Sequence, residues 1–276
     1  MHHLIPSRIL LYVSMAFSAL VTHAQTGYPD AGARANAMGN ASVTLTDVFS
    51  VQNNTAAMGM LEESAIGLSA QNYFMVEGGL SAFYGAGVFA TERSGNIGVS
   101  AHFTGDPTFN QTKIGLAYGR KLADELAIGL QLDYVGTRIV EAGSGQAFTF
   151  DIGVLYTPAE NISIGAKAFN PIRVENGMER PEPLPSVISA GLSWRVSEKV
   201  LLCAEGEQDL ENAIRLKTGL EYQIIDALFL RGGYISDPSM FTAGFGLQLK
   251  TFQLDASAQF HQQLGVTPGF GLRYQL

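Results

Sequence analysis

The stretch ELAIGLQLDYVGTRIV, residues 125–140, decides the fold class. Its large apolar side chains stand at alternate positions from Leu126 to Tyr134, so as a strand they share one face, while Gln131 and Asp133 share the other. This two-residue period predicts a β-strand with one apolar and one polar face. The question it raises is which of the two faces meets water.

The same alternation recurs from Ser64 to Leu276, in about fourteen segments of roughly ten residues each. Short turn signals separate them, such as Asp106-Pro107 and Asp237-Pro238. Segments of this length match tilted strands that cross a bilayer. The pattern predicts an antiparallel meander of hairpins, and an even number of strands allows the meander to close into a barrel.

A soluble β-sandwich or barrel is the alternative, in which the apolar side chains would fill a core. The polar parity, however, is rich in glycine and serine and poor in the lysine and glutamate that cover soluble domains. The apolar side chains are also too numerous for one closed core, whereas an inside-out barrel places them against lipid. The sequence therefore predicts an all-β transmembrane antiparallel outer-membrane β-barrel of about 14 strands. Aromatic residues near the ends of the segments are expected to form interfacial girdles: Tyr118, Tyr134, Tyr156, Trp194, Tyr222, Tyr234 and Tyr274.

Composition supports this fold class and excludes several functions. The 276 residues include 31 glycines, and 15% of the residues are charged, which suits strands joined by tight turns. A net charge of −8 argues against a nucleic-acid partner, which needs a basic face. The single cysteine, Cys203, rules out an intramolecular disulfide and a cysteine-based zinc cluster.

The N-terminus carries an export signal. Arg8 precedes an apolar run over residues 9–21, and Thr22-His23-Ala24 offers a small residue at a cleavage point before Gln25. We predict a signal peptide over residues 1–24, with an uncleaved anchor helix as the alternative. Together with the barrel pattern, this predicts localisation in the outer membrane of a Gram-negative bacterium, in contact with its lipid.

Residues 25–63 break the alternation and are rich in alanine, glycine and asparagine. Residues 33–38 and 47–52 are expected to form short helices, the second with Asp47 as its N-cap. Because small residues allow close packing on glycine-rich strands, we predict a hatch, or plug, that enters the barrel of residues 64–276 from the periplasmic side. The alternative is a disordered leader, but the segment has few charges and many apolar residues.

The start of this segment, GARANAMGNASVTLTDVFSVQNNTAAM, resembles mature FadL-type outer-membrane proteins, and especially the PorV/PorQ branch associated with the type IX secretion system. The branch pattern has Gly-Ala-Arg, then Ala-Met-Gly-Gly-Ala, then Asn-Pro-Ala. Asn40 stands in place of the second glycine, and Thr55 in place of the proline. The chain is shorter than FadL-type transporters usually are, which implies clipped external loops. The hatch motif carried over by this resemblance comprises Gly32, Ala33, Arg34, Ala37, Met38, Gly39, Ala41, Asn54 and Ala56.

No nucleophile motif, phosphate-binding loop or dinucleotide fingerprint is present, so we expect neither catalysis nor a cofactor. His102 and His261 are single polar-face residues and predict lumen lining, not a metal site. Lumenal charges of both signs are expected to pair across the interior and with Arg34, giving a sealed, rigid barrel. These charges are Lys113, Lys121, Asp133, Asp151, Lys167, Arg195, Glu205, Glu207, Arg215, Lys217, Glu221, Lys250, Asp255 and Arg273.

The longest loop, NPIRVENGMERPEPLP over residues 170–185, has four prolines and alternating charge. It predicts either a partner-docking loop, through Arg173, Glu175, Glu179 and Arg180, or a stiff connection. Three functions remain open. The resemblance favours a non-enzymatic component of protein secretion that binds exported cargo or another outer-membrane or secretion-system protein. The alternatives are a FadL-like channel for hydrophobic small molecules and a purely structural barrel.

Overall fold

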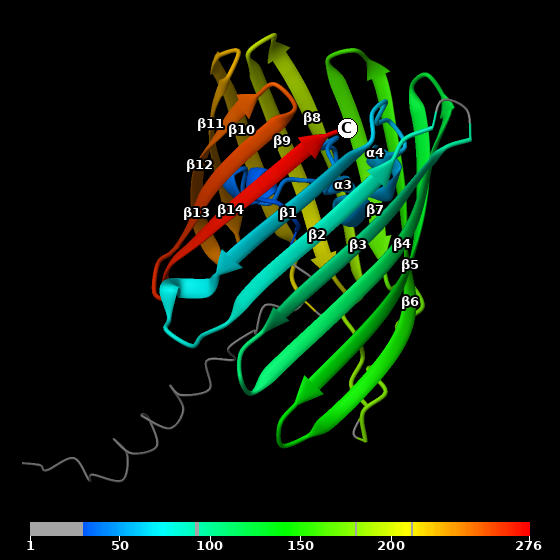
Figure 1. Cartoon of the computed structure of the whole chain (residues 1–276), viewed down its shortest axis with the longest axis vertical. Coiled ribbons are helices and arrows are strands. Elements are labelled where there is room, and N and C mark those ends of the chain that lie inside the picture. The colour runs from blue at the N-terminus through cyan, green and yellow to red at the C-terminus, as the bar shows by residue number, and fades with distance from the viewer. Residues whose placement is uncertain (1–29, 92–93, 180, 211) are drawn as a thin grey trace, which may run out of the picture.

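The computed structural model describes residues 30–91, 94–179, 181–210 and 212–276 (Figure 1). The signal-peptide prediction and Arg180 of the loop lie outside these residues. The strands are β1 (Ala65–Asn72), β2 (Ser81–Phe89), β3 (Asn96–Gly105), β4 (Phe109–Ala123), β5 (Leu126–Ile139), β6 (Gly143–Ala159), β7 (Ile162–Phe169), β8 (Val187–Ser197), β9 (Val200–Asp209), β10 (Arg215–Ile225), β11 (Leu228–Ser236), β12 (Ser239–Leu249), β13 (Phe252–His261) and β14 (Gly265–Gln275).

These 14 strands, counted over the described residues, form one closed antiparallel barrel. Each strand pairs with its neighbours in sequence, and β1 closes the barrel on β14, with Ala65 opposite Gln275 and Gln71 opposite Gly269. The hydrophobic alternation therefore specified both the strands and their meander order. The predicted fold class is confirmed.

Strand β5 answers the question of which face meets water. Leu132 has 59% of its surface exposed on the outside of the barrel, whereas its neighbours Gln131 and Asp133 are 0% and 1% exposed in the interior. The same holds around the wall, where Leu68, Phe148 and Phe270 are exposed. A barrel with apolar side chains outside and buried charges inside is suited to lipid, so the predicted orientation of the two faces is correct.

The two ends of the barrel differ in their connections. Tight turns join β4 to β5, β8 to β9 and β12 to β13 at the end that also holds the C-terminal Leu276 (Figure 1). The opposite end carries the longer connections, including residues 170–186 and the η1 turn (Tyr73–Met75). Because outer-membrane barrels have short periplasmic turns and longer external loops, we assign the C-terminal end to the periplasm.

The segment that precedes β1 lies inside the barrel (Figure 1). Residues 30–63 contain the short helices α2 (Ala33–Ala37), α3 (Ser50–Asn53) and α4 (Thr55–Met58), and nearly all of the residues between 30 and 58 are buried. We call residues 30–63 the hatch. Among the described residues, no helix combines the length and the apolar content needed to cross a membrane.

Candidate functional site: the hatch and its seal

The backbone of the hatch explains the glycines of its motif. Gly32 and Gly39 have φ angles of 98° and 64°, a region that L side chains rarely adopt. Asn40 follows with φ 57°, and asparagine is one of the few side chains that tolerate this left-handed conformation. Asn40 therefore continues the left-handed turn that begins at Gly39.

Gly39 is also a point of close approach to the barrel wall. Its backbone N–H donates to Thr242 Oγ1 of β12 at 2.9 Å, and that hydroxyl donates to the carbonyl of Ala37 at 2.8 Å. A Cβ atom on Gly39 would lie 2.5 Å from the carbonyl oxygen of Thr218 in β10. Only a glycine can make this turn so close to two strands.

Two adjacent asparagines fix the second half of the hatch. Asn53 makes paired hydrogen bonds to the backbone N–H and carbonyl of Ala31, at 2.8 and 2.9 Å. Asn54 caps α4 by accepting from the N–H of Ala56 at 3.1 Å, and it donates to the carbonyls of Val43 and Val154, the latter in β6. The asparagine of the motif thus joins a helix start, a hatch loop and the barrel wall.

A belt of inward-facing glycines receives the hatch. We define the glycine belt as the eleven described glycines on strand inner faces at which an added Cβ would contact a hatch residue: Gly67, Gly98, Gly119, Gly129, Gly153, Gly165, Gly191, Gly219, Gly233, Gly244 and Gly271. Each comes from a different strand. At Gly129 the Cβ would lie 2.3 Å from the backbone of Thr55, and at Gly153 2.1 Å from the Asn54 side chain. The missing side chains let the backbones of hatch and wall touch, as the small-residue composition predicted.

A closed ring of ion pairs ties the hatch to the periplasmic half of the wall. Arg34 pairs with Glu221 at 2.7 Å and with Asp47 at 3.3 Å. Arg231 bridges Glu221 and Asp255 at 2.7 and 2.6 Å. Arg273 bridges Asp255 and Asp47 at 2.8 and 3.2 Å, which closes the circle. We call these six residues the arginine ring; it holds three cations and three anions.

The arginine ring also corrects a prediction about the hatch helices. The helix expected over residues 47–52 begins later, at Ser50, and Asp47 is not its N-cap. One carboxylate oxygen of Asp47 accepts the backbone N–H of Phe49 at 3.0 Å, while the other faces Arg34 and Arg273. The carboxylate of Asp47 forms ion pairs in the arginine ring. The chain between Asp47 and Ser50 forms a turn instead of the first turn of a helix.

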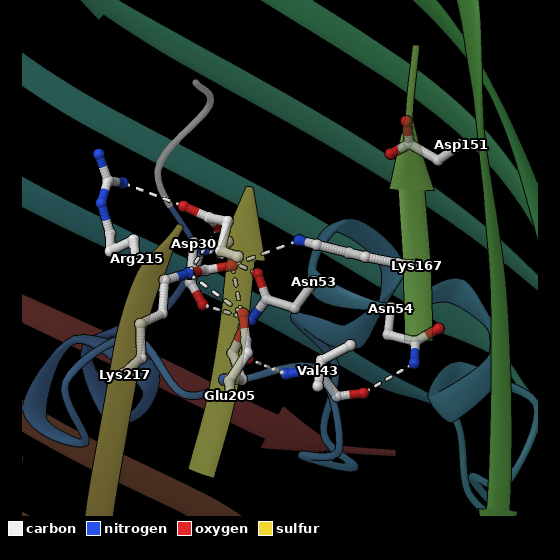
Figure 2. A network of polar contacts seen from close by, with 12 residues as sticks. Asp30, Val43, Asn53, Asn54, Asp151, Lys167, Glu205, Arg215 and Lys217 are labelled. Carbon is white, nitrogen blue, oxygen red and sulfur yellow. Dashed lines mark hydrogen bonds and ion pairs between the residues drawn. The ribbon is translucent and has the colours of Figure 1, made fainter. Parts of the chain in front are cut away.

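A second ion-pair network joins the hatch to the inner face of the wall (Figure 2). The lysine cluster comprises Lys217 with Asp30, Lys167, Glu205, Glu207 and Arg215. Lys217 Nζ lies 2.8 Å from Asp30 and 2.6 Å from Glu207. Glu205 also accepts the backbone N–H groups of Ser42 and Val43, at 2.7 and 2.9 Å. The Glu205 carboxylate therefore holds a hatch loop in place and also pairs with the ammonium group of Lys217.

Asp30 is the hatch member of the lysine cluster. Its burial alone would raise the pKa of the carboxyl group, but Lys217 and Lys167 outweigh burial and lower this pKa to about 2. Oxygens of Asp30, Glu205 and Glu207 lie close enough together to hold a metal ion. Lys217 Nζ already contacts all three, so its ammonium group supplies the cation that such a cluster needs.

The structure brings together most of the predicted lumen charges, but not all. Lys121, Arg195 and Lys250 are exposed at the periplasmic end, where Lys121 pairs with Asp124 and Arg195 lines the mouth of the lumen. The predicted place of Lys121 and Lys250 in the lumen is wrong, because the strands extend beyond the hatch at that end. Asp30 and Arg231 belong to these networks but were not among the lumenal charges predicted from the sequence. Arg231 has a sequence signal, since it stands on the polar parity of LFLRGGYIS, residues 228–236.

The periplasmic mouth forms a cavity of about 530 Å³ that four members of the arginine ring line: Arg34, Asp47, Glu221 and Arg273. Glu62, Glu63 and Arg195 line its rim together with Tyr274. Of the two candidate histidines, His102 stacks on Tyr84 with ring centroids 4.4 Å apart, and His261 accepts two backbone N–H groups. Neither belongs to a described cluster of metal-ligating side chains.

The long loop between β7 and β8 is built around Asn170. The Asn170 side chain accepts from Thr149 and from the N–H of Val174, and it donates to the carbonyl of Leu184 at 3.1 Å. Within the loop, Met178 and Leu184 are buried, whereas the predicted docking residues Arg173, Glu175 and Glu179 are exposed. The loop is thus a shaped surface that presents charged side chains outward.

Comparison with protein-family models and with curated proteins finds no sequence match. Solved structures do match. The toluene transporter TbuX of Ralstonia pickettii aligns with TM-score 0.69 and 12% identity, over 90% of this chain and 99% of that one. The toluene transporter TodX of Pseudomonas putida gives 0.71 and 11%, over 91% and 99%. A FadL homologue of Pseudomonas aeruginosa gives 0.65 and 13%, over 91% and 99%.

These similarities extend over at least nine-tenths of the chain. The outward apolar face and the buried interior charges agree with a membrane-embedded wall. This fold is the one expected for the predicted localisation in the outer membrane of a Gram-negative bacterium. The chain therefore has the fold of the FadL-type outer-membrane barrels, with an N-terminal hatch seated in the lumen.

Proposed function

We propose that the protein is a channel for uptake of hydrophobic small molecules across the outer membrane, with the hatch as its movable closure. The observation that supports this most is a hatch seated in the lumen of a barrel whose fold resembles those of two toluene transporters. This reverses the order suggested by the motif resemblance, which put a secretion component first.

The packing of the hatch argues against a permanently open aqueous pore. Hatch residues lie against the inner faces of eleven strands along the glycine belt, and the arginine ring spans the periplasmic side. A solute therefore needs the hatch to move, or a path beside it. Porins for hydrophilic solutes instead keep a water-filled lumen.

One side of the hatch contact is apolar and suits a hydrophobic solute. Val48 and Phe49 of the hatch pack with Tyr73, Tyr84 and Val88 on the β1–β2 side of the barrel. The wall from β9 to β14, which adjoins β1 through β14, carries the arginine ring and most of the lysine cluster. A hydrophobic molecule would meet compatible surface on the first side and a high desolvation cost on the second.

A disulfide between hatch and wall tests the proposal. A Cβ on Gly271 of β14 would lie 3.3 Å from Cβ of Ala33, close to the roughly 3.5–4.5 Å of a disulfide, so the double variant Ala33→Cys/Gly271→Cys should cross-link. Cells that produce the full chain should take up labelled toluene faster than cells without it. Oxidation of the double variant should abolish this gain, and a reductant should restore it.

The single substitutions Ala33→Cys and Gly271→Cys serve as controls, because each variant carries only one member of the engineered pair besides the native Cys203. If cells with and without the protein take up the label at the same rate, the channel proposal is wrong. If uptake is retained while the disulfide is fully formed, the hatch is not the movable closure.

A partner-binding barrel of a secretion system, of the PorV/PorQ kind, is the second candidate function. The exposed charges of the β7–β8 loop, Arg173, Glu175 and Glu179, favour it, because the loop is shaped by its own hydrogen bonds and would lose little entropy on binding. A pull-down of the mature protein in mild detergent tests this. A partner chain that is lost in Glu175→Gln/Glu179→Gln would put secretion ahead of uptake.

A further inference from the structure

A third group of lumenal charges differs from the other two because its numbers of cations and carboxylates are unequal. Among the described residues, the arginine ring and the lysine cluster each hold three cations and three carboxylates. Lys113 of β4 contacts two carboxylates, Asp133 of β5 and Asp151 of β6. If both were ionised, this group would carry an uncompensated negative charge in a buried place, which is costly.

The oxygens of this group are not all paired. Lys113 Nζ lies 3.1 Å from Asp151 Oδ2 and 3.5 Å from Asp133 Oδ2, and Gln131 donates to Asp133 Oδ1 at 2.7 Å. Within the described part of the chain, Asp133 Oδ2 and Asp151 Oδ1 are buried and accept no hydrogen bond. The two carboxyl groups also face the same ammonium group, that of Lys113. Each has the oxygen that a shared proton would need.

The neighbouring elements add no described ion pair to either carboxylate. Lys167 of β7 pairs with Asp30 of the hatch. His102 of β3 faces Lys113, stacks flat on Tyr84 and contacts the hydroxyl of Thr104. Asn170 and Thr149 hydrogen-bond to one another instead of to the carboxylates.

We propose that Asp133 and Asp151 form a proton-binding site in the folded barrel, with one proton shared between Asp133 Oδ2 and Asp151 Oδ1. One carboxyl group is then neutral and donates its O–H to the other, which stays ionised and pairs with Lys113. The group as a whole becomes neutral, like the two other networks. Two facing carboxylates that cannot both ionise are a known arrangement for holding a single proton.

This proton site is connected to the external loop. Lys113 Nζ lies 4.4 Å from the centre of the Phe169 ring, and Phe169 directly precedes Asn170, the residue on which the β7–β8 loop is built.

The sign of the pH dependence follows from the bound proton. The folded protein keeps the proton at pH values where the unfolded chain, with ordinary carboxyl groups, has released it. Stability contributed by the proton is therefore full at acidic pH and falls as pH rises, until the folded protein also releases it. A neutral side chain at position 133 should remove this dependence.

Single and double asparagine variants of the full chain in phospholipid vesicles test the proposal. Asp133→Asn leaves Lys113 with one carboxylate, so its urea midpoint at pH 8 should equal or exceed that of the wild type. Asp133→Asn/Asp151→Asn leaves Lys113 without a carboxylate and should lower the midpoint. Asp255→Asn is the matched control, because it removes an equally buried carboxylate from the balanced arginine ring and should also lower it.

Infrared spectroscopy supplies a readout that does not depend on stability. Folded wild-type protein at neutral pH should show the carbonyl band of a protonated carboxyl group, which Asp133→Asn removes and Asp255→Asn retains. Absence of such a band in the wild type, or an Asp133→Asn midpoint lowered as far as that of Asp255→Asn, would overturn the proposal.

Discussion

Glycine has a different structural role on the inner and the outer face of this barrel. On the inner face, a Cβ at Gly129 or Gly153 would come within 2.3 Å of the hatch, so the absent side chain is the space in which the hatch sits. On the outer face, a Cβ at Gly85 or Gly232 would meet its nearest atom at 3.7 Å, an ordinary contact. The same residue is thus obligatory where two backbones touch and optional where the wall meets lipid.

The inner and outer faces also differ in the charged side chains that they carry. The arginine ring and the lysine cluster stand on the inner face and include the hatch residues Asp30, Arg34 and Asp47. The outer face between the barrel ends presents apolar side chains such as Leu132 and Phe148. Specific, compensated contacts therefore concentrate where the hatch docks, and the lipid face needs only apolar surface. Substitutions should be costly on the first and mild on the second.

The largest effect is expected at Lys217. Lys217→Met removes the ammonium group that contacts Asp30, Glu205 and Glu207, and leaves buried carboxylates without their shared cation. Breaking a buried ion pair by removing one partner costs about 3–5 kcal/mol. Urea unfolding in phospholipid vesicles should show a loss of this size in the free energy of unfolding.

Lys121→Met is the matched control for that variant. Lys121 pairs with Asp124 at 3.2 Å, but its side chain is 46% exposed at the barrel end. Exposed pairs contribute about 0–1 kcal/mol, so this change should be close to neutral. Equal losses in the two lysine variants would show that the lumenal ion pairs are no more specific than surface ones.

The next largest effect is expected in the glycine belt. Gly129→Ala places a methyl group 2.3 Å from the backbone of Thr55 in the hatch, which cannot give way as a flexible side chain would. Overpacking of this kind costs about 3 kcal/mol at the upper end of its usual range. The strain should displace the hatch, and protease cleavage within residues 30–63 should accelerate in the variant.

Gly85→Ala makes the same chemical change on the lipid face. Its Cβ would contact only a methyl group of Leu68 at 3.7 Å, so hatch protection and stability should stay within about 0.5 kcal/mol of the wild type. A Gly85→Ala variant that loosens the hatch as much as Gly129→Ala would remove the distinction between the two faces.

The fold was predictable from one sequence because alternation is a local signal. The parity of Gln131 and Leu132 fixes which side of β5 each occupies, and repetition of the pattern fixes the meander. The hatch was predictable in outline for a related reason, since a run of small residues without alternation fits neither a strand nor a soluble core. The resemblance in its motif pointed to the same architecture.

The partners within the site were not predictable in the same way. Arg34 was expected to pair with lumenal charges, but its contact with Glu221 depends on the depth of the hatch and on the register of β10, which no local pattern encodes. Asp30 gave no signal because it precedes the motif. The start of α3 was misplaced because Asp47, a good N-cap by type, is used in the arginine ring instead.

The smallest of the expected effects is a loss of folding stability at acidic pH. The pKa of Asp30, lowered from 3.8 to about 2 mainly because Lys217 and Lys167 outweigh its burial, means that the folded state favours the ionised carboxylate. This stabilisation is fully present above pH 4 and is lost as the pH falls towards 2, by about 2 kcal/mol. Asp30→Asn cannot titrate, so the difference in unfolding free energy between the wild type and this variant should shrink between pH 5 and pH 2. A difference that stays constant over that interval would mean that the hatch is not held through the charge of Asp30, and that the glycine belt seats it without help from the lysine cluster.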